Sequence, residues 1–185
     1  MKTGITQKTT ERFLIGPGAV YSGFTNPSTP GTLLGATIGG NVVNIAREFY
    51  VPSLDGALGP VKGSRRLISE IPSVTANLTE ITKANLLLAL AGTSATVSGS
   101  HDLIVSDGAI SAGNYLSNVA IVGEKSGTTH PVCFVVKQAL STEPVEINLG
   151  TGKDDDVVLQ TVFTGHYLPE SPGVPPYEIW SPTEA

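Results

Sequence analysis

Glycine and proline recur at short intervals along the whole chain, and they limit how long any helix or strand can be. The 185 residues include 21 Gly and 13 Pro, spread along the sequence rather than collected in one linker. Turn residues at such intervals separate the short strands of β domains. Between the turns, residues 42–51 alternate, with Val43, Ile45 and Phe49 on one face, which indicates a strand with one buried face. The pattern predicts about ten strands in an antiparallel, mainly β architecture.

Length and composition predict one β domain, residues 1–168, with polar residues 1–11 as an N-terminal arm. Hydrophobic residues make up 40% of the chain, enough for a folded core, whereas charged residues make up only 15%. Soluble domains carry roughly 25% charged residues. The low value indicates a surface covered by partners, or strand faces rich in Ser and Thr. Residues 169–185 are rich in proline, so we expect an extended C-terminal segment anchored by Tyr177, Ile179 and Trp180.

One segment has helical periodicity. Asn77 precedes Glu80 by three residues, a variant of the capping box, and Gly92 suits the position after the last turn. We therefore predict a helix over residues 77–91. Its apolar stripe is wide enough to face both the subunit's own sheet and a neighbouring chain. The side chains expected to pack are Ile81, Ala84, Leu87 and Leu88.

Residues 52–65 form an unusually long connection between two strand patterns. Hairpin loops usually have 2–5 residues, and longer loops tend to be functional. Leu54, Leu58 and Val61 give this loop apolar contacts to make, so we predict a docking loop. Asp55 and Lys62 complete the candidate contact residues. The return strand, 66–78, contains Pro72, which predicts an edge or a bend there.

No segment has a pattern typical of catalysis. His101, His130 and His166 lie far apart and lack metal-ligand spacing, and Cys133 is alone in an apolar run, 132–136, whose two faces should both be covered. The Gly-x-Ser-x-Gly motif is absent. We predict no catalytic residue, no metal site and no cofactor, and therefore not an enzyme.

Two further sites fail on spacing. Residues 56–64 depart from the phosphate-loop pattern, and residues 154–156 lack the alternating ligands of a calcium loop. The net charge of −5, without a basic cluster, excludes typical specific DNA binding. There is no secretion signal pattern and no apolar stretch near the ~20 residues that span a bilayer, so we expect folding in a cytoplasm.

Four motifs occur in a characteristic order. They are Gly-Pro-Gly-Ala-Val-Tyr (16–21), Leu-Leu-Gly-Ala-Thr-Ile-Gly-Gly (33–40), Asp-Gly-Ala-Leu-Gly-Pro-Val-Lys-Gly (55–63) and Arg-Leu-Ile-Ser-Glu-Ile-Pro-Ser-Val-Thr-Ala-Asn-Leu-Thr-Glu-Ile (66–81). With them, the segment from Gly16 to Leu90 resembles the major tail tube proteins of siphophages. The match covers somewhat under half of the chain.

The resemblance implies two packed antiparallel sheets, a β-sandwich or barrel-like fold, with one flanking α-helix. Six subunits would form a ring, and stacked rings would join one sheet of each subunit into a barrel around the DNA channel. It also implies self-association, contacts with the tape measure protein and the tail terminator during assembly, and a virion tail assembled in the bacterial host cytoplasm. DNA would pass through the lumen without specific binding during genome ejection.

Within that plan, small polar residues should face the channel, because attraction to phosphates would trap the DNA. The expected lumen-facing residues are Asn44, Glu48, Ser73, Thr75 and Asn77. Loop 52–65 would contact the next ring, and the helix would brace the outside of the barrel.

Three alternatives share a β-rich fold. Another virion protein, such as a head decoration or tail terminator subunit, also lacks catalytic motifs. The inner tube of a contractile injection system has the same architecture. A carbohydrate-binding β-sandwich would need exposed aromatic residues, and the chain has one Trp, five Tyr and five Phe.

Overall fold

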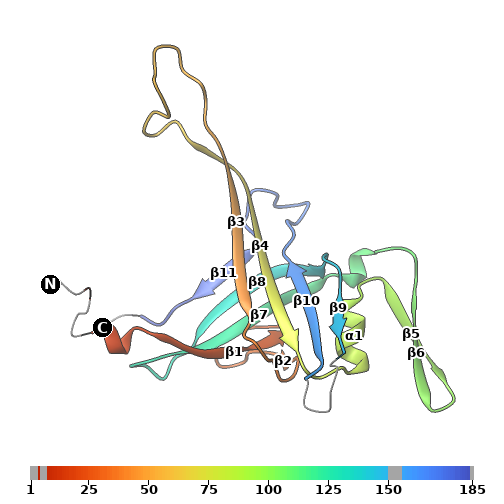
Figure 1. The fold of residues 1–185 in the computed structure, drawn as a ribbon. Helices are drawn as coiled ribbons and strands as arrows, with labels where there is room; N and C mark the ends of the chain where they lie inside the picture. Colours follow the sequence, from red (N-terminus) through yellow and green to blue (C-terminus); the bar gives the residue numbers. More distant parts are fainter. Residues whose placement is uncertain (1–3, 5–7, 150–155, 184–185) are drawn as a thin grey trace.

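A computed structural model describes residue 4, residues 8–149 and residues 156–183 (Figure 1). Strand is the main secondary structure of the described chain, with one α-helix and two short 3₁₀ helices. In chain order the elements are η1 (Thr9–Glu11), β1 (Leu14–Ser22), β2 (Thr32–Leu33), β3 (Val42–Tyr50), β4 (Arg66–Leu78), α1 (Lys83–Ala89), β5 (Thr93–Ser98), β6 (His101–Ser106), η2 (Ala112–Asn114), β7 (Leu116–Lys125), β8 (Val132–Ser141), β9 (Glu146–Asn148), β10 (Val158–Thr164) and β11 (Tyr177–Trp180).

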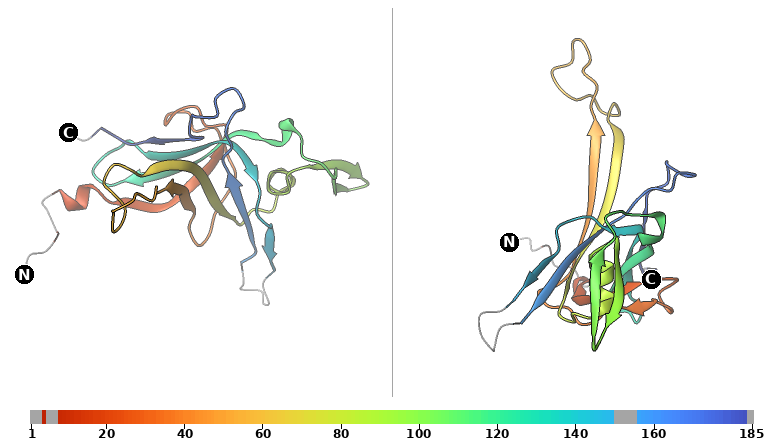
Figure 2. Two further views of the ribbon diagram at one scale, coloured as in Figure 1. Left: turned by 90° about the horizontal axis from the view of Figure 1, so that it is seen from above. Right: turned by 90° about the vertical axis from the view of Figure 1, so that its right-hand side faces the viewer.

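The strands form one large antiparallel sheet and one small sheet. The large sheet has nine strands in the order β2-β1-β7-β8-β10-β4-β3, with β11 added to β8 and β9 added to β10. Strands β5 and β6 pair only with each other. The prediction of a mainly β fold with two antiparallel sheets and one helix is confirmed. Figure 2 shows how the body, the long β3–β4 hairpin and the β5–β6 ribbon extend in different directions.

The large sheet bends, so that side chains from its two halves form one core. Val20 on β1 and Val119 on β7 come from one half, and Val74, Leu78 and Phe163 come from the other. In β4 the even-numbered side chains from Glu70 to Leu78 are buried, while Ser73, Thr75 and Asn77 point outward. Period-two alternation in the sequence therefore corresponds to a real inner and outer face.

Strand β8 is covered on both faces, as its continuous apolar run predicts. Val136 and Ala139 belong to the main core, whereas Cys133 and Val135 pack with Phe24 in a second cluster on the opposite face. One edge of β8 pairs with β7. The other edge is shared, because β11 pairs with residues 133–136 and β10 pairs with residues 140–141.

Pro72 lies inside a continuous strand rather than between two strands. β10 runs along β4 only as far as Ser73, where Thr164 is its partner. Pro72 stands one residue beyond that end, so the missing N–H costs no ladder hydrogen bond on that side. Its carbonyl still accepts a hydrogen bond from the amide of Gly165, at 2.9 Å.

The predicted helix over 77–91 is wrong in its start and in its buried face. Asn77 and Leu78 belong to β4, where pairing with Gln160 and Leu159 keeps them extended. The N-cap is Thr82, whose hydroxyl accepts a hydrogen bond from the amide of Asn85 at 3.2 Å. The capping residue is therefore a threonine five positions after Asn77, and α1 is a short helix.

The inward face of α1 is centred on a polar residue. Asn85 and Ala89 are the buried pair, whereas Ile81 and Ala84 are exposed, which corrects the expected packing set. Leu88 packs against the core, as does Leu86, while Leu87 is only half-buried. The Asn85 amide donates to the carbonyls of Leu34, at 2.7 Å, and Glu80, at 2.8 Å. These two hydrogen bonds hold Asn85 on the inward face of the helix. The spacing of apolar residues in the sequence does not predict them.

Candidate assembly interface

The tip of the β3–β4 hairpin carries the predicted docking loop. Residues 52–65 lie at the far end of the hairpin, well away from the body (Figure 1). Within the loop, the Ala57 amide donates to the Leu54 carbonyl and the Ser64 amide to the Val61 carbonyl. The five predicted contact residues, Leu54, Asp55, Leu58, Val61 and Lys62, are all exposed. The structure therefore brings them together on one protruding tip.

The stem of the hairpin is also apolar and exposed, which the sequence reading missed. Phe49, Tyr50, Leu67, Ile68 and Ile71 all have more than two fifths of their surface open. The guanidinium groups of two arginines, Arg47 and Arg65, lie 5.7 Å from the centre of the Phe49 ring. Apolar residues on adjacent positions, such as Leu67 and Ile68, were the available signal, because a strand buried on one face would alternate.

The five predicted lumen residues share one face of the sheet. Asn44 lies opposite Ser73, and Thr75 lies opposite Val42. Glu48 accepts a hydrogen bond from the Ser69 hydroxyl at 3.3 Å. Asn44 and Glu48 are four positions apart on β3, and Ser73, Thr75 and Asn77 are two positions apart on β4. Even spacing along a strand places side chains on the same face. The structure therefore groups them as a continuous patch.

Asn77, the fifth of these residues, joins the patch to β10. Its side chain accepts a hydrogen bond from Gln160 at 3.0 Å and donates to the Gly40 carbonyl at 2.8 Å. Further along β10, the Thr164 hydroxyl lies 2.7 Å from that of Thr142. Hydroxyl and amide groups thus extend over the outer face of β10 as well.

We call this surface the polar face: the outward residues of β9, β10, β4 up to Ser69, and β3 up to Glu48. Among its described residues the charged groups are Glu48 and Glu146, and there is no Lys or Arg. Val42, Ala46, Ile71, Val158 and Val162 interrupt it with apolar side chains. It is a weakly acidic surface made mostly of small groups.

The four strands β9-β10-β4-β3 end in two unpaired edges. β3 pairs with β4 on one side and with no strand of the described chain on the other. β9 likewise pairs only with β10 among the described strands. Exposed strand edges are templates for pairing with another chain. This sheet therefore offers complementary attachment points on both sides.

A buried carboxylate fixes the base of the long hairpin. Glu70 is buried, and its Oε1 accepts a hydrogen bond from the Tyr177 hydroxyl, at 2.8 Å, and forms an ion pair with Nε of Arg47, at 2.9 Å. The hydroxyl of Tyr167 donates to the Glu70 backbone carbonyl at 2.8 Å. β3, β4, β11 and the segment after β10 therefore meet at one residue. The hydrogen bond to Glu70, followed by burial, raises the pKa of Tyr177.

The C-terminal segment is integrated into the fold. Tyr177, Ile179 and Trp180, the expected anchors, lie in β11 and pair with β8. The Trp180 ring meets Phe24 edge-on at 6.0 Å. Lys137 donates a hydrogen bond to the carboxylate of Glu178, and this interaction lowers the pKa of Glu178.

The histidines and the cysteine do not form a reactive site. No group of three or more metal-ligating side chains occurs among the described residues. His101 lies on the exposed β6, and His166 stacks edge-on against Tyr115. Burial raises the pKa of the Cys133 thiol, which makes it a poor nucleophile. In the acidic run, residues 154 and 155 lie outside the described part of the chain.

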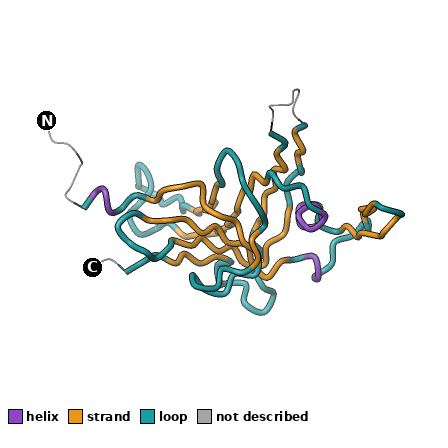
Figure 3. The backbone as a smooth tube through the Cα atoms, turned by 90° about the horizontal axis from the view of Figure 1, so that it is seen from below, coloured by secondary structure: helices purple, strands orange, loops and turns teal. Residues whose placement is uncertain are grey.

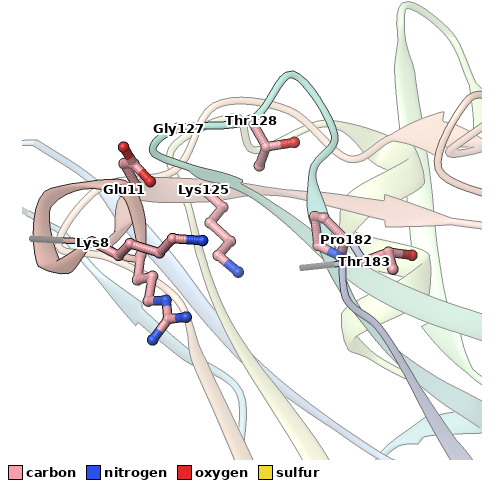
Figure 4. A pocket seen from close by; sticks show the side chains of 8 residues that line it. Lys8, Glu11, Lys125, Gly127, Thr128, Pro182 and Thr183 are labelled. Atoms are coloured by element: carbon pink, nitrogen blue, oxygen red, sulfur yellow. The ribbon is translucent and has the colours of Figure 1, made fainter. Parts of the chain in front are cut away.

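The polar pocket near the N-terminus is open and shallow (Figure 4). Lys8, Arg12 and Lys125 contribute positive charge to it, beside Glu11, and Pro182 closes one side. Among the described lining residues, Thr128 and Thr183 carry hydroxyl groups, and none is His or Cys. It is therefore a charged surface hollow at the end of β1 and β7.

Comparison with known proteins identifies no family for this chain. A scan against protein-family models finds no match, and a search of curated proteins finds no significant relative. In the described part of the chain, no helix is both long enough and apolar enough to cross a membrane.

Proposed function

We propose that this protein is a structural subunit of a phage tail tube, which assembles into hexameric rings that stack around a DNA channel. The observation that carries the proposal is the strand set β9-β10-β4-β3 of the large sheet, which has a polar face and whose outer strands, β9 and β3, each have an edge without a partner strand in the described chain. An open sheet with two free edges can join identical sheets edge to edge, and closure into a barrel removes every edge.

Strand number agrees with a channel for double-stranded DNA. Six subunits contributing four strands each would give about 24 strands, which at ~4.8 Å spacing and ~40° tilt close a circle roughly 48 Å across. Side chains narrow this opening, and a duplex of about 20 Å still passes. A barrel of this size needs small side chains on its inner face, as the polar face has.

Charge supports the same orientation. A basic lining would bind phosphates and release counterions, which makes DNA binding strong and salt-dependent. The polar face carries Glu48 and Glu146 and no described cation. A duplex sliding along it would meet hydroxyls, amides, several aliphatic side chains and two carboxylates, and would not be held.

The long hairpin supports stacking of rings. Its loop and stem expose apolar side chains far from the body. Surface patches of this kind usually mark interaction sites. Leu54, Leu58 and Val61 on the loop would be covered by the neighbouring ring. Contacts with a tape measure protein and a tail terminator would follow from this role.

The test is negative-stain electron microscopy of the purified protein over a range of concentrations. Hollow tubes or stacked six-fold rings are the expected result. A closed oligomer of another symmetry that never polymerises would contradict the tube. In that case a head decoration or tail terminator role would fit better. A sheath-binding outer surface would instead indicate the inner tube of a contractile system.

A further inference from the structure

The β5–β6 ribbon stands apart from the large sheet. Its strands pair only with each other, and it extends beyond α1 (Figure 1; Figure 3). Val97, Leu103 and Val105 are 77%, 52% and 48% exposed. A lone two-stranded ribbon is at best marginally stable in water and needs a further surface to pack on. This ribbon therefore lacks cover within its own chain.

Both faces of the ribbon need that cover. Val97 lies opposite Asp102, and Leu103 lies opposite Thr96 in the adjacent pair. Adjacent pairs in a ribbon point to opposite faces. Val97 and Leu103 therefore point away from each other, and a flat surface could cover only one of them. A groove that receives the ribbon could cover both.

Such a groove lies at the β3 side of the sheet, away from the ribbon, and is formed by β3 together with β1, β7 and β8. It holds about 420 Å³. The backbones of Gly16, Gly18 and Gly123 contribute no side chains to its lining. Its apolar walls are Leu14, Val43, Ile45, Ile121 and Phe134.

The charges beside the two surfaces are opposite in sign. Residues 93–111 contain Asp102 and Asp107 and no Lys or Arg. Lys83 of the same chain pairs with Asp102 at 2.8 Å, so Asp107 carries the remaining negative charge of the ribbon. Leu14 at the groove pairs with Lys125, which shares the neighbouring hollow with Lys8 and Arg12 (Figure 4). Complementary charges of this kind orient two surfaces as they meet.

We propose that the β5–β6 ribbon of one subunit lies in the groove of the next subunit around the ring. This inference rests on the proposed tube. The ribbon lies on the β9 side of the sheet (Figure 1), and the groove is lined by Val43 and Ile45 of β3. Edge pairing between β9 and a neighbour's β3 therefore brings ribbon and groove together as well. Each subunit gives one ribbon and receives one, a head-to-tail contact that closes into a ring.

Cross-linking between two differently tagged chains tests this contact. Both chains carry Cys133→Ala; one also carries Val97→Cys, and the other Leu14→Cys. After mixing under assembly conditions, a short bismaleimide should give a covalent dimer of mixed size. The matched control replaces Val97→Cys with Val174→Cys, an exposed valine in the loop between β10 and β11. That pair should give no mixed dimer.

A double variant, Val97→Ser with Leu103→Ser, gives a second measurement. Both side chains are exposed in the single chain, so circular dichroism and urea unfolding should match the unmodified protein. Ring formation, followed by analytical ultracentrifugation, should need about tenfold more protein or above, because two apolar side chains no longer become buried. Val174→Ser should leave ring formation unchanged.

The outcomes separate the two proposals. Six-fold rings without the mixed dimer, together with normal assembly of the double variant, would overturn the ribbon contact and leave the tube standing. A mixed dimer in a closed oligomer of another symmetry would keep the contact and remove the tube. Absence of both assembly and cross-link would contradict both.

Discussion

Glu70 connects the long hairpin to the C-terminal strand, and its removal should be costly. Glu70→Ala leaves the half-buried hydroxyl of Tyr177 without its acceptor and Arg47 without its ion pair, and losing the acceptor of a buried donor typically costs about 1–3 kcal/mol. We expect the free energy of unfolding in urea to fall by about 2 kcal/mol. Glu48→Ala is the matched control, since Glu48 is an exposed carboxylate on the same hairpin; it should change stability by less than about 0.5 kcal/mol. Equal losses in the two variants would contradict the role of Glu70.

The raised pKa of Tyr177 predicts a loss of stability at alkaline pH. The folded protein holds the phenol proton more tightly than the unfolded chain does, so the contribution is complete below the ordinary tyrosine pKa of about 10. It is lost as the pH rises from there through the raised folded-state pKa. Urea unfolding between pH 8 and pH 11 should therefore give a steeper decline for the unmodified protein than for Tyr177→Phe. Parallel pH profiles would count against this linkage.

Residue partnerships were the least predictable level. Tyr177 is 107 positions from Glu70, and the Leu34 carbonyl is 51 positions from Asn85. No local pattern contains such distances. A usable signal did exist at Glu70, because it occupies an even position of β4, in phase with the buried Val74 and Ala76. A charge on the apolar face of a strand indicates a buried partner.

At the scale of elements, the loop of the β3–β4 hairpin should control stacking but not folding. We expect the triple variant Leu54→Ser, Leu58→Ser and Val61→Ser to form rings that do not stack, because the apolar contacts to the next ring are gone. The side chains are exposed, so the free energy of unfolding should stay within about 0.5 kcal/mol of that of the unmodified protein. Electron microscopy and sedimentation would measure ring and tube fractions. Ser53→Ala is the control, and tubes of normal length in the triple variant would refute the assignment.

Elements with clear periodicity could be predicted, and those made by tertiary pairing could not. β3 was expected over 42–51 and spans Val42–Tyr50, but the predicted buried face is wrong beyond Ile45. Val43 and Ile45 are half-buried, whereas Phe49 is 42% exposed because the hairpin has left the body at that point. The helix was drawn too long because a run of leucines fits several periods, while the ladder with β10 kept Asn77 extended. β11 depends on the unoccupied edge of β8, which local sequence does not encode.

For the whole assembly, positive charge on the polar face should convert a passive channel into a binding one. Ser73→Lys with Thr75→Lys should leave tubes intact, since both side chains point outward from the core. Short DNA duplexes should then be retained by the variant tubes, with an affinity that falls steeply as salt rises. Gel filtration of tubes with labelled duplex would measure retention. Glu170→Lys, outside the polar face, is the control.

Retention in the control but not in the Ser73 and Thr75 variant would place the channel elsewhere on the molecule. Equal and weak retention in all tubes would show that these positions never meet DNA. The polar character of the face was predictable from residues 73–77, because alternate small polar residues stand out in a strand. Its extension over β10 was not, since it required the register between β4 and β10.

The hydrogen bond between Tyr177 and Glu70 can form only late in synthesis of the chain. A ribosome adds about 5–20 residues per second, so the phenol is synthesised roughly 5 to 20 seconds after the carboxylate it receives. During that interval β8 also waits for the strand that completes its edge. In a nascent chain, the base of the long hairpin therefore lacks the hydrogen bond from Tyr177. If the subunits form the proposed tube, chains on neighbouring ribosomes of one messenger RNA would have hairpins not yet set for docking, and translation would delay polymerisation until each chain has passed Trp180.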